Sequence, residues 1–115
     1  MEFVVTDADT AAAFSTGDVP VLATPRVVAL CEEAARLAVI DELNQGETTV
    51  SSRVEVSHVS PVPVGATVTA EAVLERIEGR RLVFAVSVGD MCGLIAAGRI
   101  TRVVVETERF LKKAL

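Results

Sequence analysis

The feature that most limits how this chain can fold is one long segment, residues 24–43, that has helical composition and is apolar around much of its circumference. Thr24 can accept hydrogen bonds from the first free backbone N–H groups, and Pro25 has the φ angle of a first helical residue. At about 100° per residue, the apolar side chains fall on one broad arc. They are Val27, Val28, Leu30, Cys31, Ala34, Ala35, Ala38 and Val39. A helix of this kind needs cover on several sides.

The second half of the chain supplies this cover as strands. Residues 48–60 alternate between apolar and polar side chains, which predicts a strand whose helix-facing side carries Val50, Val54, Val56 and His58. Three further apolar or alternating segments are predicted strands: residues 67–76, 82–88 and 94–107, the last with Gly98 as a bend or bulge.

Smaller elements are predicted near the two ends. Residues 2–6 form a short strand, residues 7–14 a brief helical turn capped by Asp7 or Asp9, and residues 106–115 a short amphipathic helix. The order predicts an α+β hot-dog fold, a single domain over residues 1–115 in which a curved antiparallel sheet of about five strands wraps the long helix. The exposed edge strands of such a sheet predict at least a dimer.

Composition excludes several classes of protein. A net charge of −5 argues against nucleic-acid binding, because neutralising phosphates requires a basic surface. No apolar run reaches the roughly 20 residues of a membrane span, and no signal peptide precedes the first strand. With only two cysteines, a disulfide framework is not expected and a reducing cytoplasm is the expected compartment. One histidine and scattered carboxylates are a poor ligand set, so no metal is expected.

Three polar residues are unusual for their predicted positions. Glu32 lies at the margin of the apolar arc, His58 is the only histidine and lies on the apolar side of its strand, and Thr24 begins the helix. Each has an ordinary explanation: Glu32 pairs with Arg36, His58 is a satisfied core or strand-end histidine, and Thr24 is an N-cap.

Together the three could converge near one point. A helix N-terminus offers free N–H groups and a partial positive charge that suit a developing oxyanion. Burial against apolar neighbours would raise the pKa of the carboxylate towards the range of a general base. These are parts for acyl transfer or hydrolysis.

Several segments resemble the fluoroacetyl-CoA-thioesterase-like family of hot-dog proteins. They are residues 21–36, 46–50, 54–58, 63–65, 79–82 and 108–110. The resemblance covers nearly the whole chain, and its most specific part is the order and spacing of Thr24, Glu32 and His58. It implies that these are the catalytic residues of an acyl-CoA thioesterase, a homodimer or a tetramer, with sites near the dimer interface and no cofactor besides the CoA of the substrate.

Three departures from the family pattern limit what the resemblance implies. Ser51 stands where family members often have glycine close to the acyl group, residues 98–102 lack a histidine often present there, and Phe14 is the only aromatic residue of the loop before the long helix. The resemblance therefore implies the reaction class and not the fluoroacetyl substrate.

The expected mechanism assigns a role to each residue. Glu32 is nucleophile or general base, Thr24 and the helix N–H groups support the oxyanion, and His58 holds Glu32 or water and protonates the thiolate. The substrate-binding candidates are Ser51, near the acyl group, and Arg53, Arg80, Arg81 and Arg99, for the CoA phosphates. For each arginine, a solvated surface position is the alternative.

Three other interpretations stay open. The first is a non-catalytic hot-dog module that binds acyl-CoA. The second is a hot-dog enoyl-CoA hydratase or dehydratase; these enzymes pair an aspartate with a histidine a few residues apart, and no acidic residue follows His58 within that reach. The third is a structural dimer in which the three polar residues are merely satisfied.

Overall fold

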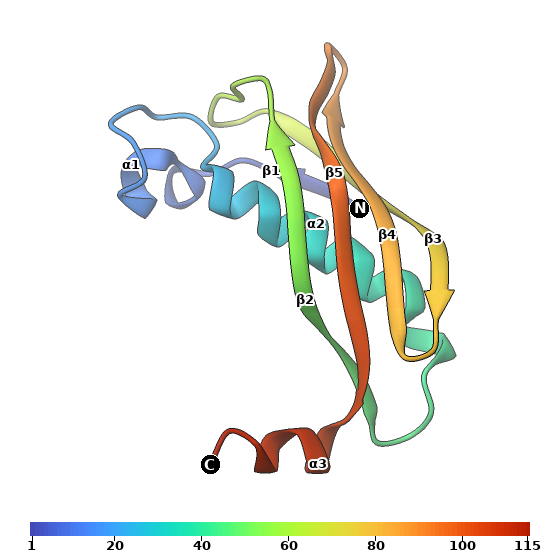
Figure 1. Cartoon of the computed structure of the whole chain (residues 1–115). Helices are drawn as coiled ribbons and strands as arrows, with labels where there is room; N and C mark the ends of the chain where they lie inside the picture. The colour runs from blue at the N-terminus through green and yellow to red at the C-terminus, as the bar shows by residue number, and fades with distance from the viewer.

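The helix α2 packs against one face of a curled antiparallel sheet in the computed structural model, which describes residues 1–115 (Figure 1). The sheet has five strands in the order β1-β3-β4-β5-β2. The elements are β1 Glu2–Val4, the 3₁₀ helix η1 Asp7–Asp9, α1 Ala11–Phe14, α2 Thr24–Val39, the 3₁₀ helix η2 Ile40–Glu42, β2 Glu47–His58, β3 Thr67–Glu78, β4 Arg81–Asp90, β5 Gly93–Glu106 and α3 Thr107–Lys112. The predicted α+β arrangement of one long helix and about five strands is confirmed.

The core lies between α2 and the concave face of the sheet. From α2 it contains Val27, Leu30, Cys31, Ala34, Ala35 and Val39, which confirms most of the predicted apolar arc. Phe84 and Ile100 from the central strands are fully buried against them. Burying a side chain of this size contributes about 1.5–3 kcal/mol, so the helix is held mainly by its apolar arc.

Ala38 is the exception to the predicted arc, because it is exposed. It lines a surface groove of 460 Å³ between α2 and β3, together with Ala34, Ala70 and Ala72. The methyl groups that face one another across this groove are too short to close it. The prediction that Ala38 is covered was therefore wrong.

The ends of α2 differ from the prediction. Ala23, with φ −70° and ψ 141°, is the N-cap and Thr24 is the first helical residue, so Thr24 is not the cap. The α-helix ends at Val39, whose φ of −124° and ψ of 0° leave the helical region, and the 3₁₀ turn η2 continues to Glu42. A turn follows at residues 44–46, with Gly46 at φ +85°.

A bulge in β2 changes which side chains face the helix. The pairing with β5 shifts between Ser51 and Arg53, so one extra residue enters β2 there. Val54 pairs with the buried Ile100, whereas Val50 pairs with Val103 on the outer face. Val50 was predicted to share a face with Val54 and His58; the inserted residue moves it to the other face.

Gly98 is also explained differently from the prediction. The register of β5 does not shift at Gly98, so it is not a bulge. A Cβ atom at this position would lie 1.8 Å from the backbone oxygen of Glu55. Glycine is required here because the backbones of β5 and β2 approach too closely for any side chain.

The short N-terminal helices are capped by threonines and not by Asp7 or Asp9. Thr6 is the N-cap of η1 and Thr10 the N-cap of α1, where its hydroxyl accepts a hydrogen bond from Ala13 N–H. Asp9 is the third residue of η1, and its carboxylate accepts the backbone N–H of Thr6 in a capping box.

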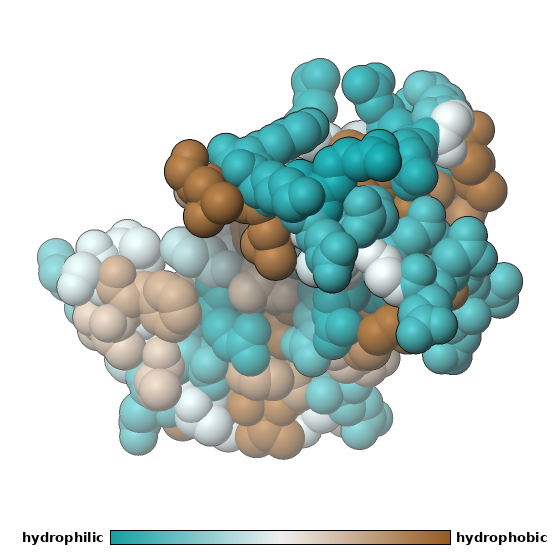
Figure 2. Space-filling view, turned by 90° about the horizontal axis from the view of Figure 1, so that it is seen from below, coloured by the Kyte–Doolittle hydropathy of each residue, from teal (hydrophilic) through white to brown (hydrophobic).

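The surface includes large apolar side chains and free strand edges. Figure 2, seen from the end of the molecule that carries α3, shows separate hydrophobic patches among hydrophilic side chains. The exposed apolar side chains include Val73, Ile77, Phe110 and Leu111. β1 pairs with only three residues of β3, and β2 pairs only with β5, which leaves an edge open along β2. No helix is long and apolar enough to span a membrane.

Candidate functional site

The side chains of Thr24 and His58 meet where α2 begins. Thr24 Oγ1 lies 2.8 Å from His58 Nδ1, across 34 residues of sequence. Thr24 is the first residue of α2, and His58 is the last residue of β2. Backbone hydrogen bonds hold the segments next to both residues. Near Thr24, Leu22 N–H donates to Val62 O, and next to His58, Val59 N–H donates to Ile95 O, both at 2.8 Å. The contact therefore joins two held segments.

The first turn of α2 has no side-chain cap. Because Ala23 occupies the capping position, the Thr24 hydroxyl is free to bind His58. Pro25 has no N–H group and Val27 N–H donates to Ala23 O, so the N–H groups of the first turn that remain for an outside acceptor are those of Thr24 and Arg26. Together with the positive end of the helix dipole, they suit a substrate oxygen that gains negative charge.

The second ring nitrogen of His58, Nε2, is buried and has no hydrogen-bond partner. A buried N–H group without an acceptor costs more than an unpaired lone pair. This favours the tautomer in which Nδ1 carries the proton and donates it to Thr24 Oγ1. In that arrangement the Thr24 hydroxyl proton is left for a substrate oxygen in the adjoining groove.

That groove has a volume of 370 Å³ and reaches the surface at Thr24, which is exposed. Its remaining lining comes from residues 11–22 and from the segment after β2. Its apolar side chains include Val19, Val21, Leu22 and Val59. The groove thus combines an apolar wall with the Thr24–His58 pair.

Glu32 lies in a different polar contact. Its Oε1 atom is 3.8 Å from Nη1 of Arg102, whose side chain is only 8% exposed, whereas that of Glu32 is 36% exposed. Arg102 also donates to Thr49 Oγ1, Thr49 O and Ser51 Oγ, each at 2.8 Å. Burial lowers the pKa of the Arg102 guanidinium, and the charge of Glu32 opposes that effect. Glu32 thus pairs with Arg102. The ordinary explanation for Glu32, an ion pair with Arg36, is therefore wrong.

The structure brings two of the three predicted residues, Thr24 and His58, into contact, and Glu32 is bonded to neither. Thr24 and Glu32 are eight residues apart on α2, which is about 12 Å along the helix axis. Glu32 makes no hydrogen bond to Thr24 or His58. Since helical side chains lean towards the N-terminus, the Glu32 carboxylate lies over the turn that precedes it.

Arg102 contacts the candidate site residue Glu32, and the sequence analysis did not single it out. The signal was an arginine two positions after the buried Ile100, which places it on the helix-facing side of β5. A charged side chain on that face must be paired, and Glu32 supplies the partner.

The predicted substrate-binding residues do not gather at one place. Ser51 belongs to the Arg102 contact. Arg53 is exposed on the outer face of the sheet and paired with Glu55. Arg80 donates to Glu47 and to the Val104 carbonyl, at 3.4 and 3.2 Å. Arg81 is exposed and lies opposite Val103 in the sheet register. Arg99 forms an ion pair with Glu75.

Cys31 is not a competing nucleophile. Its side chain is fully buried, and burial followed by the charge of Glu32 raises the pKa of its thiol to about 11. At neutral pH almost none of it is thiolate, the reactive form.

Comparison with known proteins identifies close relatives. A family model described as fluoroacetyl-CoA-specific thioesterase matches residues 5–108. The fluoroacetyl-CoA thioesterase of Streptantibioticus cattleyicolor is 38% identical over 93 residues, which cover 81% of this chain and 67% of that enzyme.

Solved structures agree with the family match. A structure of a fluoroacetyl-CoA thioesterase superposes with a TM-score of 0.93 at 33% identity, over 99% of this chain and 89% of that one. A variant of a fluoroacetyl-CoA-specific thioesterase in complex with fluoroacetate and CoA gives a TM-score of 0.90 at 34% identity. The match covers 96% of this chain and 93% of that one. A hot-dog-like protein from Thermanaerovibrio acidaminovorans gives a TM-score of 0.91 at 28% identity. The match covers 99% of this chain and 84% of that one. The predicted hot-dog fold is confirmed.

Proposed function

The chain belongs to the fluoroacetyl-CoA-specific thioesterase family and is a thioester hydrolase, and we propose that it cleaves small acyl-CoA thioesters with Thr24, Glu32 and His58. The observation that carries this proposal is the 2.8 Å contact between Thr24 and His58 at a helix N-terminus without a side-chain cap. It supplies a hydroxyl, an imidazole and backbone N–H groups beside one groove. Thioester cleavage needs groups of these kinds.

In the proposed reaction the thioester carbonyl oxygen accepts hydrogen bonds from the Thr24 hydroxyl and the first N–H groups of α2. In one route Glu32 attacks the carbonyl carbon and forms a mixed acyl anhydride, which water hydrolyses after the thiolate has left. In the other route Glu32 removes a proton from a water that attacks the carbonyl carbon, and later passes that proton to solvent. The C–S bond then breaks, and the leaving thiolate takes the Nε2 proton of a His58 ring that is protonated on both nitrogens at this step; His58 keeps its Nδ1 proton towards Thr24 and regains the other from solvent. The products are a carboxylate and the CoA thiol. The reaction uses water and needs no metal or other cofactor.

The acyl group is proposed to lie near Ser51 and Arg102. These residues border Glu32, so a carbonyl within reach of Glu32 would direct its acyl substituent towards them. A serine hydroxyl is larger and more polar than the hydrogen of a glycine, which favours a short acyl chain. For the CoA phosphates we propose Arg80 and Arg81 at the turn between β3 and β4, and Arg53 on β2.

We further propose that the protein is a homodimer in the cytoplasm. The support for the dimer is the open edge of β2, twelve residues long, and the apolar side chains that remain exposed in the single chain. Pairing along β2 would bring the second copy close to Ser51 and His58. Light scattering during gel filtration tests the dimer: twice the chain mass is expected, and the mass of one chain would contradict it.

The experiment that tests the proposed function is thiol release from a panel of short, branched and aromatic acyl-CoAs, with binding measured in parallel by calorimetry. Release from at least one short acyl-CoA is expected. Binding of CoA esters without release would favour a non-catalytic module, and hydration of an enoyl-CoA would favour a hydratase.

A further inference from the structure

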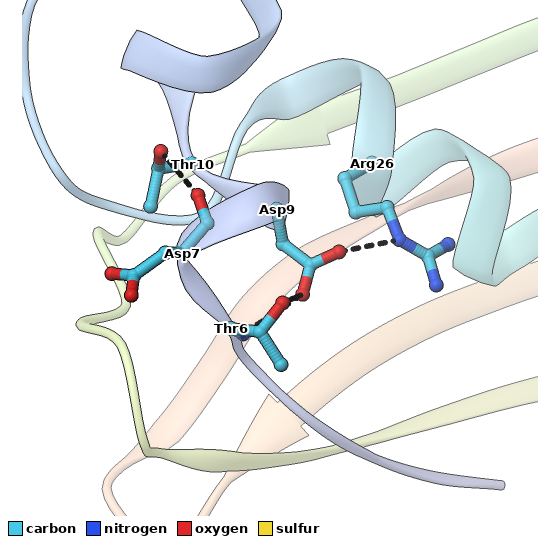
Figure 3. Close-up of polar contacts among 5 residues, drawn as sticks. All are labelled: Thr6, Asp7, Asp9, Thr10 and Arg26. Carbon is cyan, nitrogen blue, oxygen red and sulfur yellow. Dashed lines mark hydrogen bonds and ion pairs between the residues drawn. The ribbon is translucent and has the colours of Figure 1, made fainter.

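A cluster of charged and polar side chains holds the start of α2 on the side away from His58. We call Thr6, Asp9 and Arg26 the α2 clamp; Figure 3 shows Asp9 between the other two. Asp9 Oδ2 accepts hydrogen bonds from the N–H group and the hydroxyl of Thr6, at 2.8 and 2.7 Å. Asp9 Oδ1 accepts one from Arg26 Nε at 3.0 Å. Both carboxylate oxygens are therefore engaged.

Asp9 is connected to α2 at two points. Its backbone oxygen accepts the N–H of Ala23 at 2.8 Å, and its side chain binds Arg26. Ala23 directly precedes Thr24, and Arg26 follows two residues after it. Because residues two apart on a helix point about 200° away from each other, Arg26 faces Asp9 while Thr24 faces His58. The two connections bracket Thr24 and restrict rotation and sliding of the first turn.

The clamp is built so that it does not move easily. Asp9 is 8% exposed, so its contact with Arg26 is screened less by salt than a surface ion pair. The Arg26 guanidinium also lies 4.4 Å from the ring centroid of Phe3, a cation–π distance. Arg26 is therefore held from two directions.

We propose that Asp9 and Arg26 are positioning residues for thioester hydrolysis, which fix the first turn of α2 so that Thr24 and the free N–H groups keep their geometry towards His58. The inference rests on the proposed function of Thr24 and His58. The first turn lacks a side-chain cap, so when the clamp is broken only the backbone bonds of Leu22 and Ala23 still hold the start of the helix. Displacing catalytic groups by about 1 Å can cost about 100-fold in rate. Neither residue needs to touch the substrate.

The test compares Arg26→Gln, Arg26→Lys and Asp9→Asn with the control Arg76→Gln. The control breaks a similar contact, Arg76 Nε to Glu78 Oε1 at 3.4 Å, on the exposed strand β3. For Arg26→Gln we expect kcat to fall about 10- to 100-fold with KM within about twofold. Arg26→Lys, which keeps the charge, should recover part of the rate. The control should retain the wild-type rate.

The second readout is the ¹⁵N NMR spectrum of the imidazole ring. His58 is the only histidine of the chain, so the two imidazole nitrogen resonances in the spectrum both belong to it. Their couplings to the ring protons distinguish Nδ1 from Nε2. Loss of the clamp should move the Nδ1 resonance, which reports the contact with Thr24, while the control leaves it unchanged. A role in stability alone would lower the unfolding temperature without changing kcat or this resonance in the folded protein.

The outcomes separate the clamp from the proposed function. If Arg26→Gln and Asp9→Asn fold and match the control in kcat and in the Nδ1 resonance, the inference is wrong. If Thr24→Val keeps full turnover, the proposed catalytic role of Thr24 fails, but the Nδ1 resonance of Arg26→Gln still decides whether the clamp sets the contact with His58.

Discussion

Arg102 Nη1 donates a hydrogen bond to Ser51 Oγ at 2.8 Å across two paired strands. The same guanidinium nitrogen lies 3.8 Å from the Glu32 carboxylate, so the serine helps to orient the charge that faces Glu32. The residue at position 51, where glycine is frequent in the family pattern, therefore affects both the space near the proposed acyl group and the direction of Arg102.

Replacing Ser51 should change which acyl group is preferred. Ser51→Gly removes the hydroxyl and the Cβ atom, so we expect kcat/KM for longer acyl chains to rise about tenfold relative to acetyl-CoA, the range for a methylene-sized change in a pocket. The measurement is kcat/KM for an acyl-CoA series. Ser57→Ala, on the exposed face of β2, is the control; an unchanged preference in Ser51→Gly would place the acyl group elsewhere.

Removing the Thr24 hydroxyl should reduce turnover without unfolding the protein. Thr24 is exposed and is not the N-cap, so Thr24→Val loses the contact with His58 but no helix cap. We expect kcat to fall about 100- to 1,000-fold, the usual cost of one oxyanion donor. Thr67→Val, exposed on β3, serves as the control. Unchanged kcat in Thr24→Val would remove Thr24 from the mechanism.

The fold was more predictable than the contacts of the site. The apolar arc from Val27 to Val39 and the alternation in the strands are local periodicities, so they can be read from the sequence. The bulge between Ser51 and Arg53 depends on how β2 pairs with a strand that follows about 45 residues later, so local alternation misplaced Val50. The choice of Ala23 as N-cap likewise depends on its contact with Asp9.

The site was partly predictable for the same reason. The sequence indicated that Thr24, Glu32 and His58 could converge near one point, and the structure brings Thr24 and His58 into contact. The contact of Glu32 with Arg102 joins α2 to the last strand, and local sequence contains no signal for it beyond a charged residue on an apolar face.

Gly98→Ala should destabilise the fold strongly. The added methyl group would lie 1.8 Å from Glu55 O, so the two backbones must separate. We expect the free energy of unfolding to fall by about 3–5 kcal/mol. Denaturant titration measures it. Gly17→Ala, whose Cβ would meet only the Ala11 methyl at 3.3 Å, should cost much less; equal losses would show that the close approach of β2 is not the cause.

Acid should remove the contribution of Asp9 to stability. Burial raises the pKa of the Asp9 carboxyl, but hydrogen bonds from Thr6 and Arg26 and the Arg26 charge outweigh it and hold the pKa below its ordinary 3.8. A lowered pKa in the folded state gives stability that is complete above the unfolded pKa and is lost as pH falls through the folded one. The stability difference between wild type and Asp9→Asn should therefore be constant near neutral pH and shrink below about pH 4. Unfolding temperatures from pH 7 to pH 2.5 measure it; a difference that does not change with pH would contradict the assignment.

The most direct test of the proposed catalytic site is thiol release by Glu32→Gln compared with Glu33→Gln. The two glutamates are neighbours on α2, but Glu32 borders Arg102 and Glu33 is exposed to solvent. We predict that Glu32→Gln lowers kcat by a factor of about 100 or more, because the amide is neither a nucleophile nor a base, and that Glu33→Gln keeps the wild-type rate. Equal rates in the two variants, both folded, would contradict the catalytic role of Glu32.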